Sequence, residues 1–360
     1  MMIFELIQVA LGQRERLSHS LSVEEWGDLY ETAIKQSVVG IAFEGVRRLP
    51  KEQCPPQSTL FQWIGHSEQI KAKNQVLNER SVEVTKLFSD VGFSSCILKG
   101  QGNAQMYHNP FSRMPGDIDI WILGHIDGEK LADKKLRSEI NLFVKGRCPG
   151  AFEQSHHIEF PIFRDVSVEV HYKPGTLVNP IADRRFLRWC NDMKDDIVNC
   201  PLGFYVPSVK FNAVFQMAHI MVHFFIEGIG LRQFIDYYYV LKSLSIHENV
   251  LEIRSLFNQF GLLQFAKGVM WIQKECLGLE DQYLIVEPDK RTGKVILKEM
   301  LEGGNFGHYD ERYKSRKKGY ISRGLTDIYR LMTLASVFPS ESMWKIYRKA
   351  ENQKWKIKRN

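Results

Sequence analysis

The chain has 360 residues, of which 44% are hydrophobic, and its 48 lysines and arginines against 42 acids give a net charge of +6. This length suits two or three domains with sizeable cores, and no apolar run reaches the roughly 18–20 residues of a membrane span, so we expect no membrane partner. The six cysteines form no C-x-x-C pair, which argues against a zinc site and indicates a reduced, cytoplasmic protein.

Residues 1–90 are predicted to form an N-terminal helical region. The first eight residues lack a basic stretch and contain Glu5, which indicates an amphipathic helix rather than a signal peptide. Ser22-Val-Glu-Glu25 is a capping box that begins a helix running to about Arg47. Prolines 50, 55 and 56 break this helix, and a long helix follows from about Ser58 to Asp90.

Residues 91–206 are predicted to form an α/β core. A short apolar strand covers 93–98, a short helix follows Gly100, and a second strand surrounds Asp117 and Asp119. Helical periodicity then covers 127–143, and two strands at 157–163 and 166–172 form a hairpin. This order gives a small mixed β-sheet with helices packed against it.

Residues 207–360 are predicted to form a C-terminal helical domain with a basic tail. The expected helices cover 209–225, 231–244, 250–260 and 263–277. The predicted fold class is therefore α+β, with N-terminal helices, a small mixed sheet and a C-terminal helical domain.

Asp117 and Asp119 lie two residues apart in an apolar stretch with Ile118 and Ile120. Side chains alternate along a strand, so both carboxylates leave on one face and both isoleucines on the other. Two like charges held this close repel each other, and a divalent cation with oxygen ligands, Mg²⁺ above all, compensates for that repulsion. We therefore expect a metal site, and we expect that replacing both aspartates leaves the fold as stable or more stable.

Glu169 lies in a second alternating strand, on the same face as His171. If this strand pairs beside the first, Glu169 joins Asp117 and Asp119 at one end of the sheet. Three such carboxylates could hold the metals of nucleotidyl transfer, with His171 as a supporting imidazole.

Taken together, these residues resemble the bacterial "uncharacterised nucleotidyltransferase" family of the DNA polymerase β-like nucleotidyltransferase superfamily. The resemblance spans about residues 70–240 and lies in Leu98-Lys-Gly100, Arg113-Met-Pro-Gly-Asp-Ile-Asp119, Glu169-Val-His171 and His219…His223…Leu231-Arg232…Asp236. It implies a metal-dependent enzyme that uses Mg²⁺ or Mn²⁺ and moves a nucleoside monophosphate from NTP to an acceptor hydroxyl on a small molecule, a protein or an RNA end. Asp117, Asp119 and Glu169 would be its catalytic and metal-binding residues.

The glycine signal of the wider superfamily is altered in this chain. Its Gly-Gly or Gly-Ser normally lies shortly before the aspartates, whereas sixteen residues separate Gly100 from Asp117 and the serine is missing. Nucleotide binding would then fall to Lys99, Gly100, Arg113 and Arg232. A protein of the same fold that binds nucleotides or regulates, with weak or no turnover, is the alternative function.

Each nucleotide-binding candidate also has a structural interpretation. Lys99 could extend its charge to solvent, Arg113 could form an ion pair that fixes its loop, and Arg232 could pair with Asp236 one turn along the helix. We interpret His219 and His223, also one turn apart, as core or interface residues.

The basic tail offers a surface for nucleic acid, with fourteen lysines and arginines against three acids between 312 and 360. Tyrosines 313, 320 and 347 and Trp344 recur at helical spacing, which favours a tail docked on the preceding helices over an RNA-binding tail.

Overall fold

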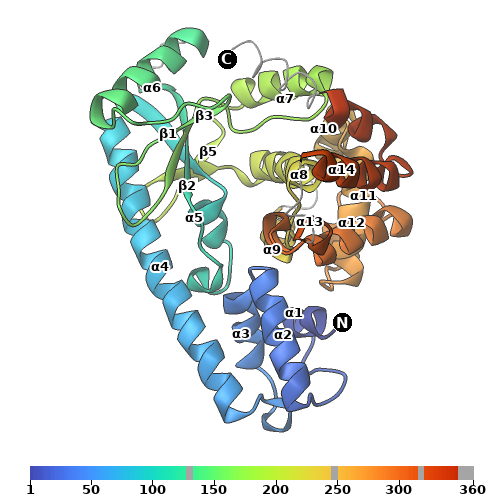
Figure 1. Ribbon diagram of the computed structural model, residues 1–360. Coiled ribbons are helices and arrows are strands. Elements are labelled where there is room, and N and C mark those ends of the chain that lie inside the picture. The colour runs from blue at the N-terminus through green and yellow to red at the C-terminus, as the bar shows by residue number, and fades with distance from the viewer. Residues whose placement is uncertain (127–132, 245–249, 315–319, 348–360) are drawn as a thin grey trace.

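The computed structural model describes residues 1–126, 133–244, 250–314 and 320–347, and it confirms the α+β class with a small mixed sheet. Figure 1 shows the long helix α4 (Gln57–Ser89) running from the N-terminal helices at one end to the sheet at the other. The C-terminal helices lie across from the sheet.

Three helices precede α4: α1 (Met2–Ala10), α2 (Val23–Lys35) and α3 (Val39–Val46), with a 3₁₀ turn η1 (Lys51–Gln53) after them. The predicted capping box is present, since the Ser22 side chain accepts from the Glu25 N–H and the Glu25 carboxylate accepts from the Ser22 N–H. The predicted continuous helix to Arg47 is wrong. The chain breaks at Ser37, whose φ of 55° lies in the left-handed region and ends α2.

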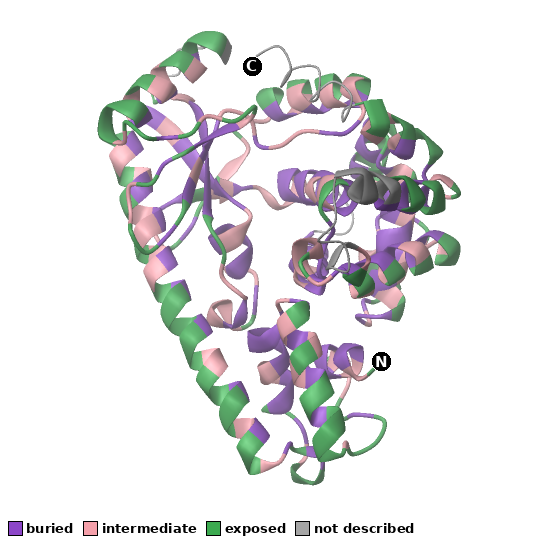
Figure 2. Ribbon diagram, viewed as in Figure 1, coloured by how far each residue is buried: buried purple, intermediate pink, exposed green. Residues whose placement is uncertain are grey.

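Helix α4 presents one buried stripe to the rest of the molecule. Its buried residues recur at intervals of three, four or seven positions, which keeps them on one side of the helix, and the opposite side is exposed (Figure 2). The buried positions are Thr59, Trp63, Ile70, Asn74, Leu77, Ser81, Val84 and Phe88. The first part of this stripe faces the helical core and the second part faces the sheet.

The sheet has four strands in the order β1-β2-β4-β3. They are β1 (Phe93–Leu98), β2 (Ile118–His125), β3 (His157–Glu159) and β4 (Val168–His171). Strand β2 pairs antiparallel with β1 and parallel with β4, and β3 pairs antiparallel with β4. The sheet is therefore mixed, and the predicted hairpin between β3 and β4 is confirmed.

The two faces of β2 pack against different hydrophobic cores. Ile118, Ile120 and Ile122 pack with α4 and α6 (Asp133–Arg147), whereas Trp121 stacks on Phe211 of α8 (Val209–Ile226) with ring centroids 5.7 Å apart. The alternation predicted around Asp119 is therefore confirmed. The first residues of the helix predicted over 127–143 lie outside the described residues.

Two short elements and a hairpin complete the α/β region. They are α5 (Gly100–Ala104), the 3₁₀ turn η2 (Pro110–Ser112), and the pair β5 (Ile197–Asn199) and β6 (Tyr205–Pro207). Helix α7 (Pro180–Asp192), which was not predicted, begins at Asn179, whose side chain caps the first turn.

The four predicted C-terminal helices are confirmed as α8 (Val209–Ile226), α9 (Leu231–Ser243), α10 (Val250–Gln259) and α11 (Leu263–Glu275). Further elements follow: η3 (Asp281–Tyr283), α12 (Lys290–Gly303), η4 (Asn305–Gly307), α13 (Glu311–Lys314) and α14 (Tyr320–Ala335). Among the described residues, α8 is the one helix long and apolar enough to cross a membrane, and 67% of its apolar window is buried inside the protein.

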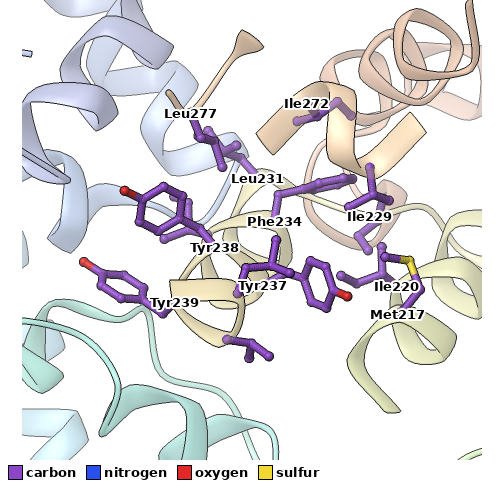
Figure 3. Close-up of a cluster of buried hydrophobic side chains, with 14 of the residues drawn as sticks. Met217, Ile220, Ile229, Leu231, Phe234, Tyr237, Tyr238, Tyr239, Ile272 and Leu277 are labelled. Carbon is purple, nitrogen blue, oxygen red and sulfur yellow. The ribbon is translucent and has the colours of Figure 1, made fainter. Parts of the chain in front are cut away.

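Helix α9 lies at the centre of the larger hydrophobic core. Phe234, Tyr237 and Tyr238 on α9 pack among side chains from α8 and α11 (Figure 3). The N-terminal helices α1 to α3 contribute to this same core, and Gln13 donates a hydrogen bond of 2.9 Å to the Tyr238 hydroxyl. The boundaries predicted at 90/91 and 206/207 stay predictions.

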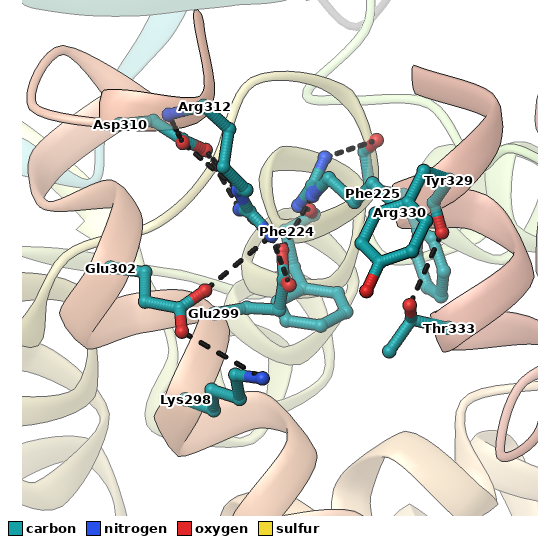
Figure 4. Close-up of polar contacts among 10 residues, drawn as sticks. All are labelled: Phe224, Phe225, Lys298, Glu299, Glu302, Asp310, Arg312, Tyr329, Arg330 and Thr333. Atoms are coloured by element: carbon teal, nitrogen blue, oxygen red, sulfur yellow. Dashed lines mark hydrogen bonds and ion pairs between the residues drawn. The ribbon is translucent and has the colours of Figure 1, made fainter. Parts of the chain in front are cut away.

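The described part of the basic tail docks through an ion-pair network and through apolar residues. Arg330 pairs with Glu299 on α12 at 2.6 Å, and Arg312 pairs with Glu299 at 2.8 Å (Figure 4). Leu334 and Phe338 are buried in the helical core, whereas Tyr347 is exposed. Of the predicted aromatics, Trp344 is partly buried against this core and takes part in docking, whereas Tyr347 does not. The side chains of Tyr313 and Tyr320, and residues 348–360, lie outside the described residues.

Candidate active site

A cleft of about 670 Å³ opens between the sheet and the helices α8 and α9. All the site residues predicted from the sequence line this one cleft: Lys99, Gly100, Arg113, Asp117, Asp119, Glu169 and Arg232. Strand β1 ends and strand β2 begins at its floor, beside β4, and the loops after β1 and before β2 carry several of its polar groups.

Asp119 and Glu169 lie directly beside each other on neighbouring parallel strands. Both point to the cleft face, because their apolar neighbours Ile118 and Val170 point into the opposite core. His171 Nε2 lies 2.9 Å from Asp119 Oδ1 and 3.4 Å from Glu169 Oε2, so one imidazole holds both carboxylates. The predicted meeting of these two acids is confirmed.

Lys99 sits at the centre of this arrangement. It follows β1, where Leu98 is paired with Asp119, and its Nζ lies 2.8 Å from Asp119 Oδ1. Its backbone has φ 50° and ψ −134°, a conformation that a non-glycine residue rarely adopts and that concentrates at functional sites. Burial lowers the pKa of Lys99, but the charges of Asp119 and Asp117 outweigh this and raise it above the ordinary value.

The contact with Lys99 also shifts the pKa of Asp119, in the opposite direction. Burial alone would raise its pKa, but Lys99 and His171 hold the pKa of this carboxyl well below its usual range. Asp119 is therefore an anion with two cationic or hydrogen-bonding partners.

Asp117 differs from Asp119 in both position and charge balance. It precedes β2 and is exposed to the cleft, and the negative charge of Asp119, followed by burial, raises its pKa. Asp119, Glu169 and His171 offer ligand atoms within 4.8 Å of one another, and Asp117 is outside that set. Its predicted role as a metal ligand stays a prediction.

Arg113 forms the buried ion pair that was one of its two predicted interpretations. Its Nε and Nη2 each lie 2.8 Å from a carboxylate oxygen of Asp236 on α9, and the Tyr107 hydroxyl donates to the same carboxylate at 2.7 Å. Asn74 on α4 donates to the Arg113 carbonyl at 2.8 Å. Asp236 therefore fixes the loop before β2 onto α9, in place of the predicted pair with Arg232.

Arg232 remains only partly satisfied. Its Nη1 donates to the Met114 carbonyl at 3.2 Å, while its buried Nε has no hydrogen-bond partner. Burial, followed by the charge of Arg113, lowers its pKa to about 10. A buried guanidinium with an unused donor in a cleft is suited to binding an anion.

The sequence model of a family described as "Uncharacterised nucleotidyltransferase" matches residues 22–278, well over half of the chain. The chain belongs to this nucleotidyltransferase family. The match includes every site residue predicted from the sequence. No curated protein and no solved structure gives a match to the chain.

The cleft also includes residues beyond the matched segment. Phe306 and His308 of the η4 region line the cleft, and the Arg232 guanidinium lies 5.8 Å from the centroid of the Phe306 ring. The sequence analysis missed both, because no local pattern ties residues 306–308 to a cleft formed by strands and helices far away in the chain.

Four histidines also line the cleft and were interpreted otherwise or missed. His219 and His223 on α8, expected in a core or an interface, face the cleft instead, and burial, followed by the charge of Lys99, keeps the pKa of His219 well below normal. His156 and His157 precede and begin β3, and His157 lies opposite His171. The hairpin turn near Arg164 was the available signal, since it places these residues across from the end of β4.

The donors at the floor of the cleft fit a divalent cation. Asp119 and Glu169 supply carboxylate oxygens, which Mg²⁺ prefers, and His171 supplies an imidazole, which Mn²⁺ also accepts. Asp117 adds a further carboxylate at the cleft surface.

Proposed function

We propose that this protein transfers a nucleoside monophosphate from NTP to an acceptor hydroxyl, with Asp117, Asp119 and Glu169 holding Mg²⁺ or Mn²⁺. The observation that carries the proposal is the pairing of Asp119 with Glu169 at the floor of a cleft that also contains Lys99 and Arg232. Acids on adjacent strands and cations on the facing elements are what a metal–triphosphate complex requires.

In this proposal the chain's own residues bind and orient the substrates. Lys99 and Arg232 bind phosphate oxygens, and Gly100 lets the triphosphate approach the backbone after β1. The ion pair between Arg113 and Asp236 holds the loop that carries Asp117 against α9. When bound, the divalent cation neutralises charge on the triphosphate and on the leaving pyrophosphate.

The reaction balances with a single proton acceptor. The acceptor hydroxyl oxygen forms a bond to the α-phosphorus, and the bond from that phosphorus to the bridging oxygen breaks, so pyrophosphate leaves. Glu169 takes the hydroxyl proton, and His171 holds the Glu169 and Asp119 carboxylates in place. We place this reaction in the cytoplasm, where the six free cysteines of the protein stay reduced.

A second candidate function is nucleotide binding with weak or no turnover. It is favoured by the ion pair between Lys99 and Asp119, which occupies a carboxylate oxygen that a metal would need. The long gap between Gly100 and Asp117 also favours it.

Labelled nucleotides separate the two functions. The protein is incubated with each NTP labelled at the α-phosphate, with Mg²⁺ or Mn²⁺ and a cell extract, and the labelled fraction is identified. Label transfer that is lost in Glu169→Gln but kept in Glu159→Gln, on neighbouring β3, supports the transfer function. Metal-dependent NTP binding without any transfer of label supports the second candidate.

A further inference from the structure

Three histidines gather beside the acidic floor of the cleft. His171 ends β4, His157 lies directly opposite it on β3, and His156 precedes His157. One ring nitrogen from each of the three can be chosen so that all lie within 4.8 Å of one another. A backbone hydrogen bond of 3.0 Å from the Tyr172 N–H to the His156 carbonyl joins the two chain segments that carry this cluster.

Two of these rings are buried with nitrogens that lack hydrogen bonds. The side chains of His157 and His171 are 5% and 3% exposed. Neither ring nitrogen of His157 has a hydrogen-bond partner, and Nδ1 of His171 also lacks one. Buried polar atoms are nearly always satisfied in folded proteins, so several unsatisfied ring nitrogens in one cluster indicate a missing ligand.

Glu169 adds a carboxylate to the histidine cluster. Its Oε2 lies 3.4 Å from His157 Nδ1 and 3.4 Å from His171 Nε2. Three imidazoles with one carboxylate form a donor set that first-row transition ions such as Zn²⁺ prefer, whereas Mg²⁺ prefers oxygen ligands alone. The absence of paired cysteines, which argued against zinc in the sequence, does not bear on a site built from histidines.

We propose that His156, His157 and His171, with Glu169, form a binding site for an imidazole-preferring divalent ion of the zinc class. This site lies next to the carboxylates proposed for Mg²⁺ and shares Glu169 with them, and its His171 contacts both Asp119 and Glu169. The inference does not rest on nucleotidyl transfer, because ion binding is measured without nucleotide.

The test titrates the metal-free, full-length protein with Zn²⁺ in a calorimeter and with Co²⁺ while the visible absorption of Co²⁺ is recorded. We expect one ion per chain and a Co²⁺ spectrum typical of mixed nitrogen and oxygen ligands. The paired variant His156→Ala with His157→Gln should weaken Zn²⁺ binding by about 10- to 100-fold. The exposed His108→Ala is the matched control and should bind as the wild type does.

If the paired variant does not fold, the single variant His156→Ala tests the site, because His156 is only half-buried. This variant should also weaken Zn²⁺ binding. Mg·ATP binding should persist in both variants, because Asp117 and Asp119 are unchanged. Wild-type protein that binds no Zn²⁺ or Co²⁺, or His156→Ala with unchanged affinity, would overturn the proposal. Label transfer from NTP is a separate readout, so the two proposals can fail independently.

Discussion

Asp117 and Asp119 share a cleft but have opposite electrostatic surroundings. Asp119 is buried and paired with Lys99 and His171, whereas Asp117 is exposed and is repelled by Asp119. The expectation that removing both charges preserves or increases stability therefore applies to Asp117 alone. Without Asp119, Lys99 keeps its charge in a buried position without its nearest partner.

Single replacements of the two aspartates should separate these effects. Asp119→Asn should lower the free energy of unfolding by about 3–5 kcal/mol and abolish Mg·ATP binding. Asp117→Asn should weaken Mg·ATP binding but leave the protein as stable or more stable at neutral pH. Urea unfolding and calorimetry measure both quantities, and an Asp119→Asn protein as stable as the wild type contradicts this account.

The raised pKa of Asp117 gives its stability effect a pH dependence. Because folding raises this pKa, the ionised carboxylate destabilises the native state above it, and protonation removes that effect. The stability gained by Asp117→Asn should thus be present at neutral pH and disappear as the pH falls through the raised pKa. Unfolding curves of both proteins at several pH values measure this difference.

Arg232 and Arg113 should also behave differently. Arg232→Ala should weaken Mg·ATP binding by about 10- to 100-fold, since a lost charge-assisted hydrogen bond amounts to about 1.5–3 kcal/mol. Arg113→Ala leaves Asp236 unpaired in the core and should mainly lower the melting temperature. Calorimetric titration together with thermal unfolding distinguishes them, and unchanged nucleotide affinity in Arg232→Ala refutes its role.

At the scale of elements, patterns within a single strand or helix were predictable from the sequence. The alternation around Asp119 and Glu169 fixed which residues share a face, and the capping box at Ser22 fixed where α2 begins. The break at Ser37 was not predictable, because neither glycine nor proline marks it.

Contacts between distant elements were the part that the sequence did not determine. The bond between Arg113 and Asp236 depends on how α9 packs against the loop before β2, and the cleft position of Phe306 depends on how η4 folds back. The histidine cluster depends on the register of β3 against β4, which the predicted hairpin leaves open. Each of these requires a register or a packing angle that local periodicity leaves open.

The η4 turn is held at the cleft by a close approach of two loops. Gly307 has a φ of 68°, and a Cβ there would collide with the Glu227 carbonyl oxygen. Gly228, with a φ of 113°, faces Gly307 in the same way. Glycine is therefore required at both positions.

Gly307→Ala should lower the free energy of unfolding by about 1–3 kcal/mol and displace Phe306 from Arg232. Gly303→Ala is the matched control, because a Cβ added to that helical glycine would meet no atom within 4 Å, so the substitution should be neutral. Denaturant unfolding of both variants provides the comparison, and equal stability of the two would show that the loop tolerates a side chain.

At the scale of the whole molecule, Glu299 connects the C-terminal segment to the helical core. It is buried and binds both Arg312 and Arg330, and Arg330 also donates to the Phe224 and Phe225 carbonyls of α8 (Figure 4). Burial raises the pKa of Glu299, but the two arginines outweigh this and lower it overall. Folding therefore depends on Glu299 being ionised.

Glu299→Gln should lower the free energy of unfolding by about 3–5 kcal/mol at pH 7. Because the folded pKa is lowered, this contribution is complete above the unfolded pKa of about 4.3 and is lost as the pH falls through the folded value. The exposed Glu302→Gln should cost less than about 1 kcal/mol. A difference between wild type and Glu299→Gln that does not shrink in acid contradicts this assignment.

The central claim, that Asp119 and Glu169 hold a metal–triphosphate complex, is tested most directly by calorimetry with a non-hydrolysable ATP analogue, with and without Mg²⁺. The account predicts Mg²⁺-dependent binding to the wild type, loss of that binding in Glu169→Gln, and unchanged binding in Glu159→Gln, whose carboxylate is exposed on neighbouring β3. Binding that is independent of Mg²⁺, or that survives unchanged in Glu169→Gln, would contradict it.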